Sequence, residues 1–195
     1  MIITIEFLER FMRVITGSCR GKKLKTLEGT DTRPTSDMVK EAVFSIIQFE
    51  LPEANVLDLF AGSGQLGIEA LSRGAKHCVF VDKNPEAVKI VRENVSDCGF
   101  VKQSRILGMD SPEYLKTAKS GLDIAFVDPP YRMGLIEKVL PLLEGKLNEG
   151  AFVICEHERE LTLPDEFGRL TLHKRYRYGK IALTVYKIPM KDEEE

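Results

Sequence analysis

The sequence lacks the residues on which several protein classes depend. Its 195 residues include no tryptophan, only three histidines and only four cysteines. The cysteines are widely separated and form no C-x-x-C pair, so we expect reduced thiols and a cytoplasmic location rather than a disulfide framework. The histidines show no metal-ligand spacing, and His157-Glu158 lacks the second histidine of a zinc protease. We therefore expect no metal.

Long apolar runs are also absent. Runs such as Ile124–Val127 have the length of a strand, far below the roughly 18 residues of a membrane span, so we expect no membrane association. Residues 1–12 contain Glu6 and Glu9 and no basic segment of the kind that opens a secretory signal. With 43% hydrophobic and 30% charged residues, the chain has the composition of a globular protein that can bury its own core.

The net charge is −2, from 28 Lys and Arg against 30 Asp and Glu, which taken alone argues against a nucleic-acid partner. The cations are nevertheless concentrated in residues 10–25, where no acid occurs, and in His173–Lys180, where tyrosines interleave with them. We expect these cations to contact RNA phosphates, although protection of a sheet edge and a polar hairpin tip would give the same pattern. The predicted RNA-binding residues are Arg13, Arg20, Lys22, Lys23, Lys25, Lys174, Arg175 and Arg177.

Short apolar strands alternate with helices from Asn55 onward. The predicted strands are Val56–Leu59, Cys78–Val81, Ile106–Met109, Ile124–Val127 and Phe152–Cys155. The predicted helices are Gln65–Arg73, one capped by Asn84 with Pro85 in its first turn, Pro112–Ala118 and Ile136–Leu143. This order predicts an α/β fold, with a Rossmann-like, doubly wound and mostly parallel sheet covered on both faces. Leu170–Tyr176 and Ile181–Ile188 predict a terminal antiparallel hairpin.

A small β/α extension is predicted before this domain. Arg13–Leu27 is β-leaning, Pro34 favours a loop, and Ser36 can cap a helix whose apolar positions include Val39 and Val43. We divide the chain into an extension over residues 1–54, an α/β domain over residues 55–188 and an acidic tail over residues 189–195.

A glycine-rich loop follows the first strand of the α/β domain. Gly62 and Gly64 permit a tight turn close to a ligand, and Gly67 permits a helix to pack closely on the sheet. Asp82, at the end of the second strand, can accept hydrogen bonds from ribose hydroxyls. Asp58 would repel the pyrophosphate of NAD but would hold an ammonium group, so the loop favours S-adenosylmethionine over NAD.

The tetrapeptide Asp128-Pro129-Pro130-Tyr131 follows the most apolar strand. Asp128 and the Pro129 carbonyl can both accept hydrogen bonds from an exocyclic amino group, which increases electron density on its nitrogen and directs it at a methyl donor. Tyr131 offers an aromatic face on which an unstacked base can lie. The alternative is a proline turn after a core strand.

DLFAGSGQLGIEALSRGA (Asp58–Ala75) together with DPPY (128–131) resembles the class I S-adenosylmethionine-dependent methyltransferases that act on amino nitrogens. The segment RVITGSCRGKKLKTLEGTDTRPTSDMVKEAVF (Arg13–Phe44) resembles more specifically the RsmD-type family of 16S rRNA guanine-N2 methyltransferases. The resemblance runs from about Met12 to the final hairpin, and residues 1–11 depart from it. It implies methyl transfer from S-adenosylmethionine to guanine N2, with 16S rRNA or the assembled small ribosomal subunit as partner. Because little chain remains for a separate recognition domain, we expect residues 1–54 to contact the RNA.

The resemblance implies a role for each motif residue. Asp58, Phe60, Gly62 and Gly64 would line the methionine part of the cofactor, Asp82 would bind its ribose, and Met109 and Asp110 would flank its adenine. The residues that would position the guanine are Asp128, Pro129 and Tyr131. Arg33 and Thr35 would contribute to the cofactor pocket, although a loop that caps the following helix explains them equally well.

Three other functions remain open at this point. Adenine-N6 methyltransferases use the same tetrapeptide logic, but they more often have Asn in place of Asp128. A non-catalytic RNA-binding factor in ribosome assembly would keep the fold, and a dinucleotide-binding protein would bind NAD instead of S-adenosylmethionine. We expect a monomer.

Overall fold

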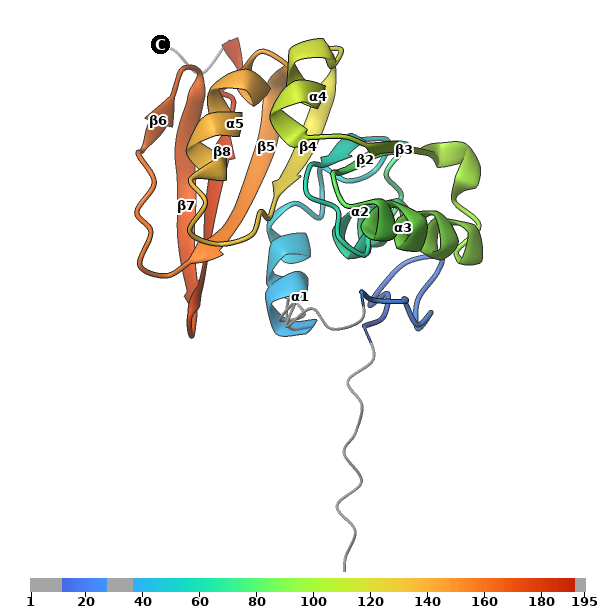
Figure 1. The fold of residues 1–195 in the computed structure, drawn as a ribbon. Helices are drawn as coiled ribbons and strands as arrows, with labels where there is room; N and C mark the ends of the chain where they lie inside the picture. The colour runs from blue at the N-terminus through green and yellow to red at the C-terminus, as the bar shows by residue number, and fades with distance from the viewer. Residues whose placement is uncertain (1–11, 28–36, 192–195) are drawn as a thin grey trace, which may run out of the picture.

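The computed structural model describes residues 12–27 and 37–191, and in it one mixed sheet of eight strands organises the chain (Figure 1). The strand order is β3-β2-β1-β4-β5-β8-β7-β6. The strands are β1 (Asn55–Asp58), β2 (His77–Asp82), β3 (Ser104–Gly108), β4 (Leu122–Val127), β5 (Leu147–Glu158), β6 (Glu166–Phe167), β7 (Leu170–Tyr178) and β8 (Ile181–Lys187). The first five are parallel to their neighbours, whereas β8, β7 and β6 are added antiparallel. The predicted fold class is therefore confirmed.

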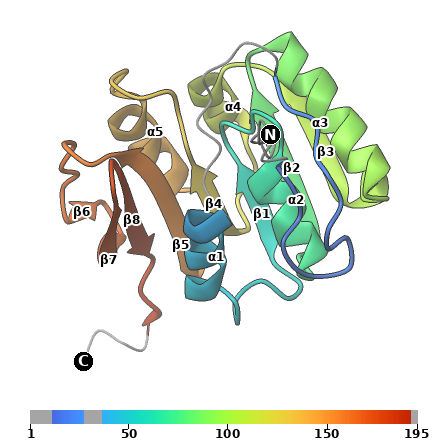
Figure 2. The ribbon, with the colours of Figure 1, turned by 90° about the horizontal axis from the view of Figure 1, so that it is seen from below.

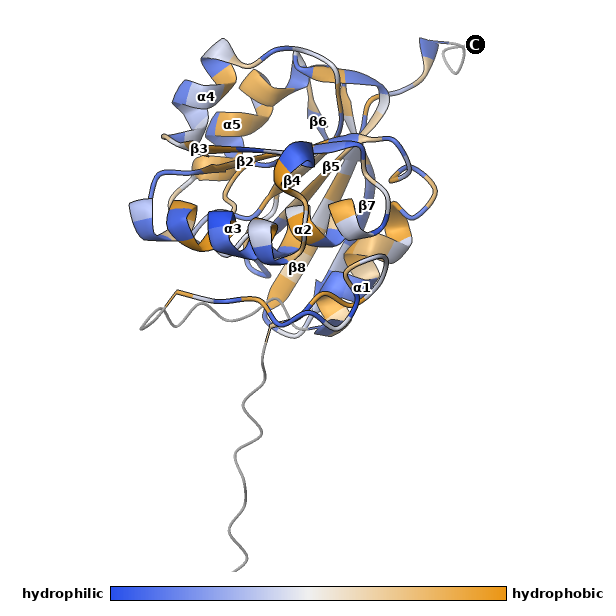
Figure 3. Ribbon diagram, turned by 90° about the vertical axis from the view of Figure 1, so that its right-hand side faces the viewer, coloured by the Kyte–Doolittle hydropathy of each residue, from blue (hydrophilic) through white to orange (hydrophobic). Residues whose placement is uncertain are grey.

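Helices cover both faces of the sheet (Figure 3). They are α1 (Asp37–Ile46), α2 (Gln65–Ser72), α3 (Pro85–Asp97), α4 (Ser111–Thr117) and α5 (Leu135–Glu144), and a short 3-10 helix spans Val101–Gln103. One hydrophobic cluster joins the sheet to α1, α2 and α3, and a second joins it to α4 and α5. The apolar strands thus lie between two apolar layers, as their near-continuous hydrophobic sequences require.

Two elements differ from expectation in extent. β5 begins at Leu147, well before Phe152, because its first residues pair with β4 before a register irregularity between Leu122 and Ile124. The two-residue strand β6 was not expected, since a pair of residues carries no detectable periodicity. Asn84 does cap α3, because its side chain accepts a hydrogen bond from the Glu86 amide.

The β-leaning segment before α1 is not a strand. Within Arg13–Leu27 the only ladder contact is one isolated bridge between Arg13 and Lys23. Gly17 and Gly21 have φ of 88° and 81°, which turns the chain back twice. The segment runs along α2 and α3 instead of joining the sheet (Figure 2).

The apolar side chains of the extension lie in the same core as those of the sheet. Val14, Leu24 and Val39 belong to the hydrophobic cluster that contains Phe126 of β4. The division at residues 54 and 188 stays a prediction, and residues 1–11 and 192–195 lie outside the described residues. The expected cap at Ser36 lies outside the described residues. None of the described helices is long and apolar enough to span a membrane.

Candidate functional site

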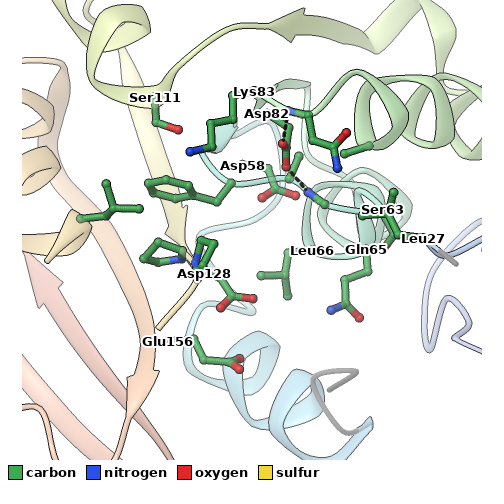
Figure 4. Close-up of a pocket in the computed structure, with 18 of the residues that line it drawn as sticks. Leu27, Asp58, Ser63, Gln65, Leu66, Asp82, Lys83, Ser111, Asp128 and Glu156 are labelled. Atoms are coloured by element: carbon green, nitrogen blue, oxygen red, sulfur yellow. Dashed lines mark hydrogen bonds between the residues drawn. The ribbon is translucent and has the colours of Figure 1, made fainter. Parts of the chain in front are cut away.

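A cavity of about 650 Å³ opens at the carboxyl ends of the parallel strands (Figure 4). Residues that end β1 and β2 line it, together with residues that follow β3 and β4. The chain reverses its direction of winding between β1 and β4, and such a switch point is where open α/β sheets bind ligands. The volume falls within the range of cofactor pockets.

The loop between β1 and α2 forms one wall of this cavity. Gly62 and Gly64 have φ of 53° and 79°, in the left-handed region that glycine adopts at little cost. A Cβ atom on Gly67 would lie 2.3 Å from the ring of Phe80 in β2, so only glycine lets α2 pack this closely. The three predicted glycine roles therefore have a structural basis.

Asp58 lies at the base of the cavity and is almost fully buried. Its Oδ2 accepts a 3.0 Å hydrogen bond from the amide of Gly67. Burial raises the pKa of Asp58 to about 7, and the nearby charge of Asp82 acts in the same direction, while the Gly67 amide opposes them. A ligand ammonium group would offset the cost of ionising this buried carboxyl, because it would compensate the negative charge.

Asp82 fixes the loop to the end of β2. Its carboxylate accepts hydrogen bonds from the amides of Gly62 at 2.9 Å and Asn84 at 2.8 Å (Figure 4). A carboxylate has about four acceptor positions, so two amides leave capacity for ligand hydroxyls. The side chain lines the cavity, where a ribose would be within reach.

A second acidic group lies beside the DPPY segment. Val127 of β4 pairs with Cys155 of β5, so Asp128, directly after β4, and Glu156, near the end of β5, occupy corresponding positions on neighbouring parallel strands. Both line the cavity, as Figure 4 shows. Burial raises the pKa of Asp128 well above its ordinary value, and the charges of Glu156 and Asp58 raise it further.

Tyr131 is held against this acidic pair. Its hydroxyl donates to Glu156 Oε1 at 3.3 Å, and its side chain is 38% exposed, which leaves ring surface accessible. Burial and the neighbouring carboxylates raise the pKa of the Tyr131 hydroxyl far above its ordinary value. The phenol therefore stays protonated at neutral pH and can act as a donor.

The cavity gathers most of the predicted site residues. Those that line it are Asp58, Phe60, Gly62, Asp82, Asp110, Asp128, Pro129 and Tyr131. Gly64 and Met109 do not line it: Gly64 caps α2, and Met109 packs against the second hydrophobic cluster. Arg33 and Thr35 lie outside the described residues. Among the described residues no group of three or more His, Cys, Asp and Glu could hold a metal ion.

Several lining residues were not expected from the sequence. They include Lys83, Ser111, Glu156, Met12, Thr26 and Leu27. Glu156 could have been found, since it follows the apolar run Phe152–Cys155 just as Asp128 follows Ile124–Val127. No sequence signal indicated that Met12, Thr26 and Leu27 of the extension would reach the cavity.

Buried side chains attach the extension to the two helices that flank the glycine loop. Glu69 of α2 accepts hydrogen bonds from the amides of Ile15 and Thr16 at 2.7 and 2.9 Å. Asn94 of α3 accepts from the Lys25 amide and donates to the carbonyls of Lys25 and Ser63, at 2.9 to 3.0 Å. One side chain thus joins the extension to the glycine loop.

The predicted RNA-binding cations differ in their surroundings. Arg13 pairs with Asp37, Lys25 with Glu93 and Asp97, and Arg175 with Asp165. Lys174 lies over the ring of Tyr176 at 5.2 Å. Arg20, Lys22, Lys23 and Arg177 are exposed as well. The two basic regions lie on the same side of the molecule, with α1 between them (Figure 1).

Comparisons with known proteins agree with this arrangement. Residues 12–187 match the family model described as Conserved hypothetical protein 95. The Bacillus subtilis protein YlbH is 40% identical over 181 residues, which cover 90% of this chain and 98% of that protein. The Escherichia coli protein named Ribosomal RNA small subunit methyltransferase D is 32% identical over 186 residues, covering 94% and 93% of the two chains.

Solved structures show the same fold. The E. coli protein yhhF aligns with a TM-score of 0.81 at 32% identity, over 93% of this chain and 99% of that one. An RNA methyltransferase from Salinibacter ruber, solved with S-adenosyl-L-homocysteine, aligns with a TM-score of 0.63 at 19% identity over 83% of this chain and 97% of that one, which shows the fold alone. With a family match over nearly its whole length, this chain belongs to the RsmD family, described as Conserved hypothetical protein 95, and has the Rossmann-like fold of class I methyltransferases.

Proposed function

We propose that this protein transfers a methyl group from S-adenosylmethionine to the exocyclic N2 of a guanine in 16S rRNA. The observation that carries the proposal is the single cavity in which the Asp58–Gly64 loop, Asp82 and the DPPY segment meet. Family membership supports the proposal, because relatives that align with nearly the full length of this chain are named as methyltransferases of small-subunit ribosomal RNA.

The residues of the cavity fit S-adenosylmethionine. Asp58 is a buried carboxylate whose raised pKa signals an uncompensated charge, and the ammonium of the methionine part would compensate it. Gly62 and Phe60 would contact the same part, Asp82 would accept from the ribose hydroxyls, and Asp110 would flank the adenine. The cofactor would supply a methyl group activated by its bond to a sulfonium sulfur.

The DPPY segment would prepare the nucleophile. The lone pair of an aromatic amino group is delocalised into the ring, so the amine is a weak nucleophile. Asp128 and the Pro129 carbonyl would accept its two N–H hydrogen bonds and direct the nitrogen toward the cofactor, while Tyr131 would stack on the base. Rate acceleration would come mainly from this positioning, which can contribute about 7–11 kcal/mol.

The basic regions on either side of α1 would hold the RNA backbone. Exposed Arg20, Lys22 and Lys23 on the extension and Arg177 on the hairpin carry charge toward solvent on that side of the molecule. Such contacts weaken as salt rises, because phosphate binding releases counterions.

Labelled S-adenosylmethionine provides the test. The protein is incubated with it and with unmodified 16S rRNA, either free or assembled into small subunits, and the RNA is digested to nucleosides. We expect label in N2-methylguanosine. Label only in N6-methyladenosine would show an adenine methyltransferase, and tight cofactor-independent RNA binding without any transfer would show a non-catalytic factor.

A further inference from the structure

Among the described residues, Glu156 is the one buried acid of the cavity to which the proposed function gives no task. Its side chain is only 6% exposed, and it follows Cys155 in β5 as Asp128 follows Val127 in β4. Two carboxylates at corresponding positions of adjacent strands raise each other's energy when both are ionised, which is costly to the fold unless a ligand compensates them. Acidic pairs of this kind are concentrated at functional sites.

Glu156 lies beside a residue proposed to bind the base, and this favours a role with the base over a role with the cofactor. Tyr131, the proposed stacking residue, donates its hydroxyl to Glu156, so ring and carboxylate share one wall. A second cavity of about 190 Å³ also borders Glu156, and the two cavities have Pro129, Pro130 and Tyr131 in common. Glu156 therefore borders both cavities beside the DPPY segment, and Figure 4 shows it in the larger one near Asp128.

Guanine and adenine differ in the edge that such a pair would meet. Beside its N2 amino group guanine carries N1–H, a second donor, whereas adenine carries the acceptor N1 beside its N6 amino group. In their ionised forms Asp128 and Glu156 present acceptors only. Two neighbouring acceptors match two neighbouring donors, and they leave the adenine N1 facing a negative oxygen. A site in which one substrate leaves a buried polar group without a hydrogen bond discriminates strongly against that substrate, here adenine.

We propose that Glu156 is a specificity-determining residue that accepts the N1–H of the target guanine while Asp128 and Pro129 hold its N2 amino group. This inference rests on the proposed function. The bound guanine donates to both carboxylates, so its binding compensates the repulsion that the empty site contains. Tyr131 holds the Glu156 carboxylate through its hydroxyl, which donates to Oε1, so the residue proposed to stack on the base also contacts the residue proposed to read its edge.

The sharpest probe is an RNA in which 2-aminopurine replaces the target guanine identified by nucleoside mapping. 2-Aminopurine keeps the N2 amino group but has an acceptor at N1. The unaltered protein should methylate guanine at least about tenfold faster than 2-aminopurine, a difference of the size expected for one base-edge contact. Glu156→Gln introduces an amide that can donate to the N1 of 2-aminopurine. We expect this substitution to lower the ratio of the guanine rate to the 2-aminopurine rate by at least about tenfold.

Glu149→Gln serves as the matched control, because it removes the same charge from the same strand outside both cavities and should leave the preference unchanged. Binding of S-adenosylhomocysteine and the melting temperature verify that each variant folds. If Glu156→Gln transfers to neither RNA, competition binding of the two RNAs replaces the rate ratio, with the same expected loss of preference.

Either of two outcomes overturns the inference while leaving the proposed function intact: equal use of both bases by the unaltered protein, or an unchanged preference in Glu156→Gln. Failure of the unaltered protein to methylate guanine N2 at all would instead overturn the proposed function.

Discussion

The side-chain amide of Asn94 in α3 donates to the backbone carbonyl of Ser63 in the glycine loop at 2.9 Å, although 31 residues separate them. The same amide nitrogen donates to the Lys25 carbonyl, and Asn94 is fully buried. The extension, α3 and the cofactor loop are therefore coupled through one side chain.

Asn94→Ala should lower both stability and cofactor affinity. The substitution leaves the Lys25 amide and the Ser63 carbonyl without this partner. Each buried polar group that loses its hydrogen bond lowers the free energy of unfolding by about 1–3 kcal/mol. Thermal melting and calorimetric titration with S-adenosylhomocysteine measure the two effects. Asn148→Ala, which removes an exposed side chain with one hydrogen bond to Asp123, is the control. An Asn94 variant with unchanged affinity would contradict the coupling.

Binding of the cofactor should depend on pH through Asp58. The raised pKa, about 7, keeps this carboxyl largely protonated below neutrality in the empty protein. An ammonium group binds the ionised form, so affinity for S-adenosylhomocysteine should weaken as pH falls below 7, by up to about tenfold per pH unit. Methylthioadenosine, which lacks the ammonium group, should show no such dependence. Equal pH profiles for the two ligands would rule out this role.

The stability of the empty protein should change with pH in the opposite sense. Between the ordinary pKa of 3.8 and about 7, the native state holds a proton on Asp58 that the unfolded chain has lost. The contribution of Asp58 to stability is therefore largest below this range and is lost as pH rises through it. Asp58→Asn should remove this component and raise the melting temperature at pH 8 relative to the parent, as measured in the absence of ligand.

Asp128→Ala should abolish methyl transfer and leave cofactor binding nearly unchanged. Asp128 follows β4 beside Glu156, whereas the groups proposed to bind the cofactor follow β1, β2 and β3. Single-turnover transfer and titration with S-adenosylhomocysteine separate the two properties. Loss of cofactor binding in this variant would mean that Asp128 has been given the wrong role.

Gly67→Ala should destabilise the protein by about 1–3 kcal/mol, the usual cost of overpacking a core. The new methyl group would lie 2.3 Å from Phe80 Cε1 and 2.7 Å from Cys78 Sγ. Gly145→Ala is the matched control, since that residue has φ of −69° and nothing within 4 Å of an added Cβ. Denaturant unfolding measures both, and similar stability in the two variants would contradict the close packing of α2.

The sequence predicts the α/β domain well because its signals are local. Apolar runs mark the central strands, Asn84 and Pro85 mark the start of α3, and Gly62 and Gly64 mark the cofactor turn. The carboxyl ends of parallel strands meet at one edge, so Asp58, Asp82 and Asp128 could be placed together without coordinates.

Contacts between distant segments were not predictable. Cys19 and Cys98 are 79 positions apart, yet both pack against the same hydrophobic cluster, and burial, followed by the effect of the nearby Cys19 thiol, raises the pKa of the Cys98 thiol to about 12. Arg13–Leu27 was expected to be β-leaning, but its backbone amides bond to side chains of Glu69 and Asn94. The periodicity of apolar residues along a sequence carries no information about a hydrogen bond between a backbone amide and a side chain more than 50 residues away.

This attachment has a consequence for the order of events during synthesis. The segment from Met12 to Leu27 leaves the ribosome early, but its partners Glu69 and Asn94 are added 54 and 69 residues after the positions they bind. Contacts of such long sequence separation form slowly. Met12 and Leu27 line the cavity, but the chain that carries them cannot be attached until α3 has been translated, and the cavity also needs Glu156 of β5. The first residues of the cavity to be synthesised must therefore wait for partners that are made much later.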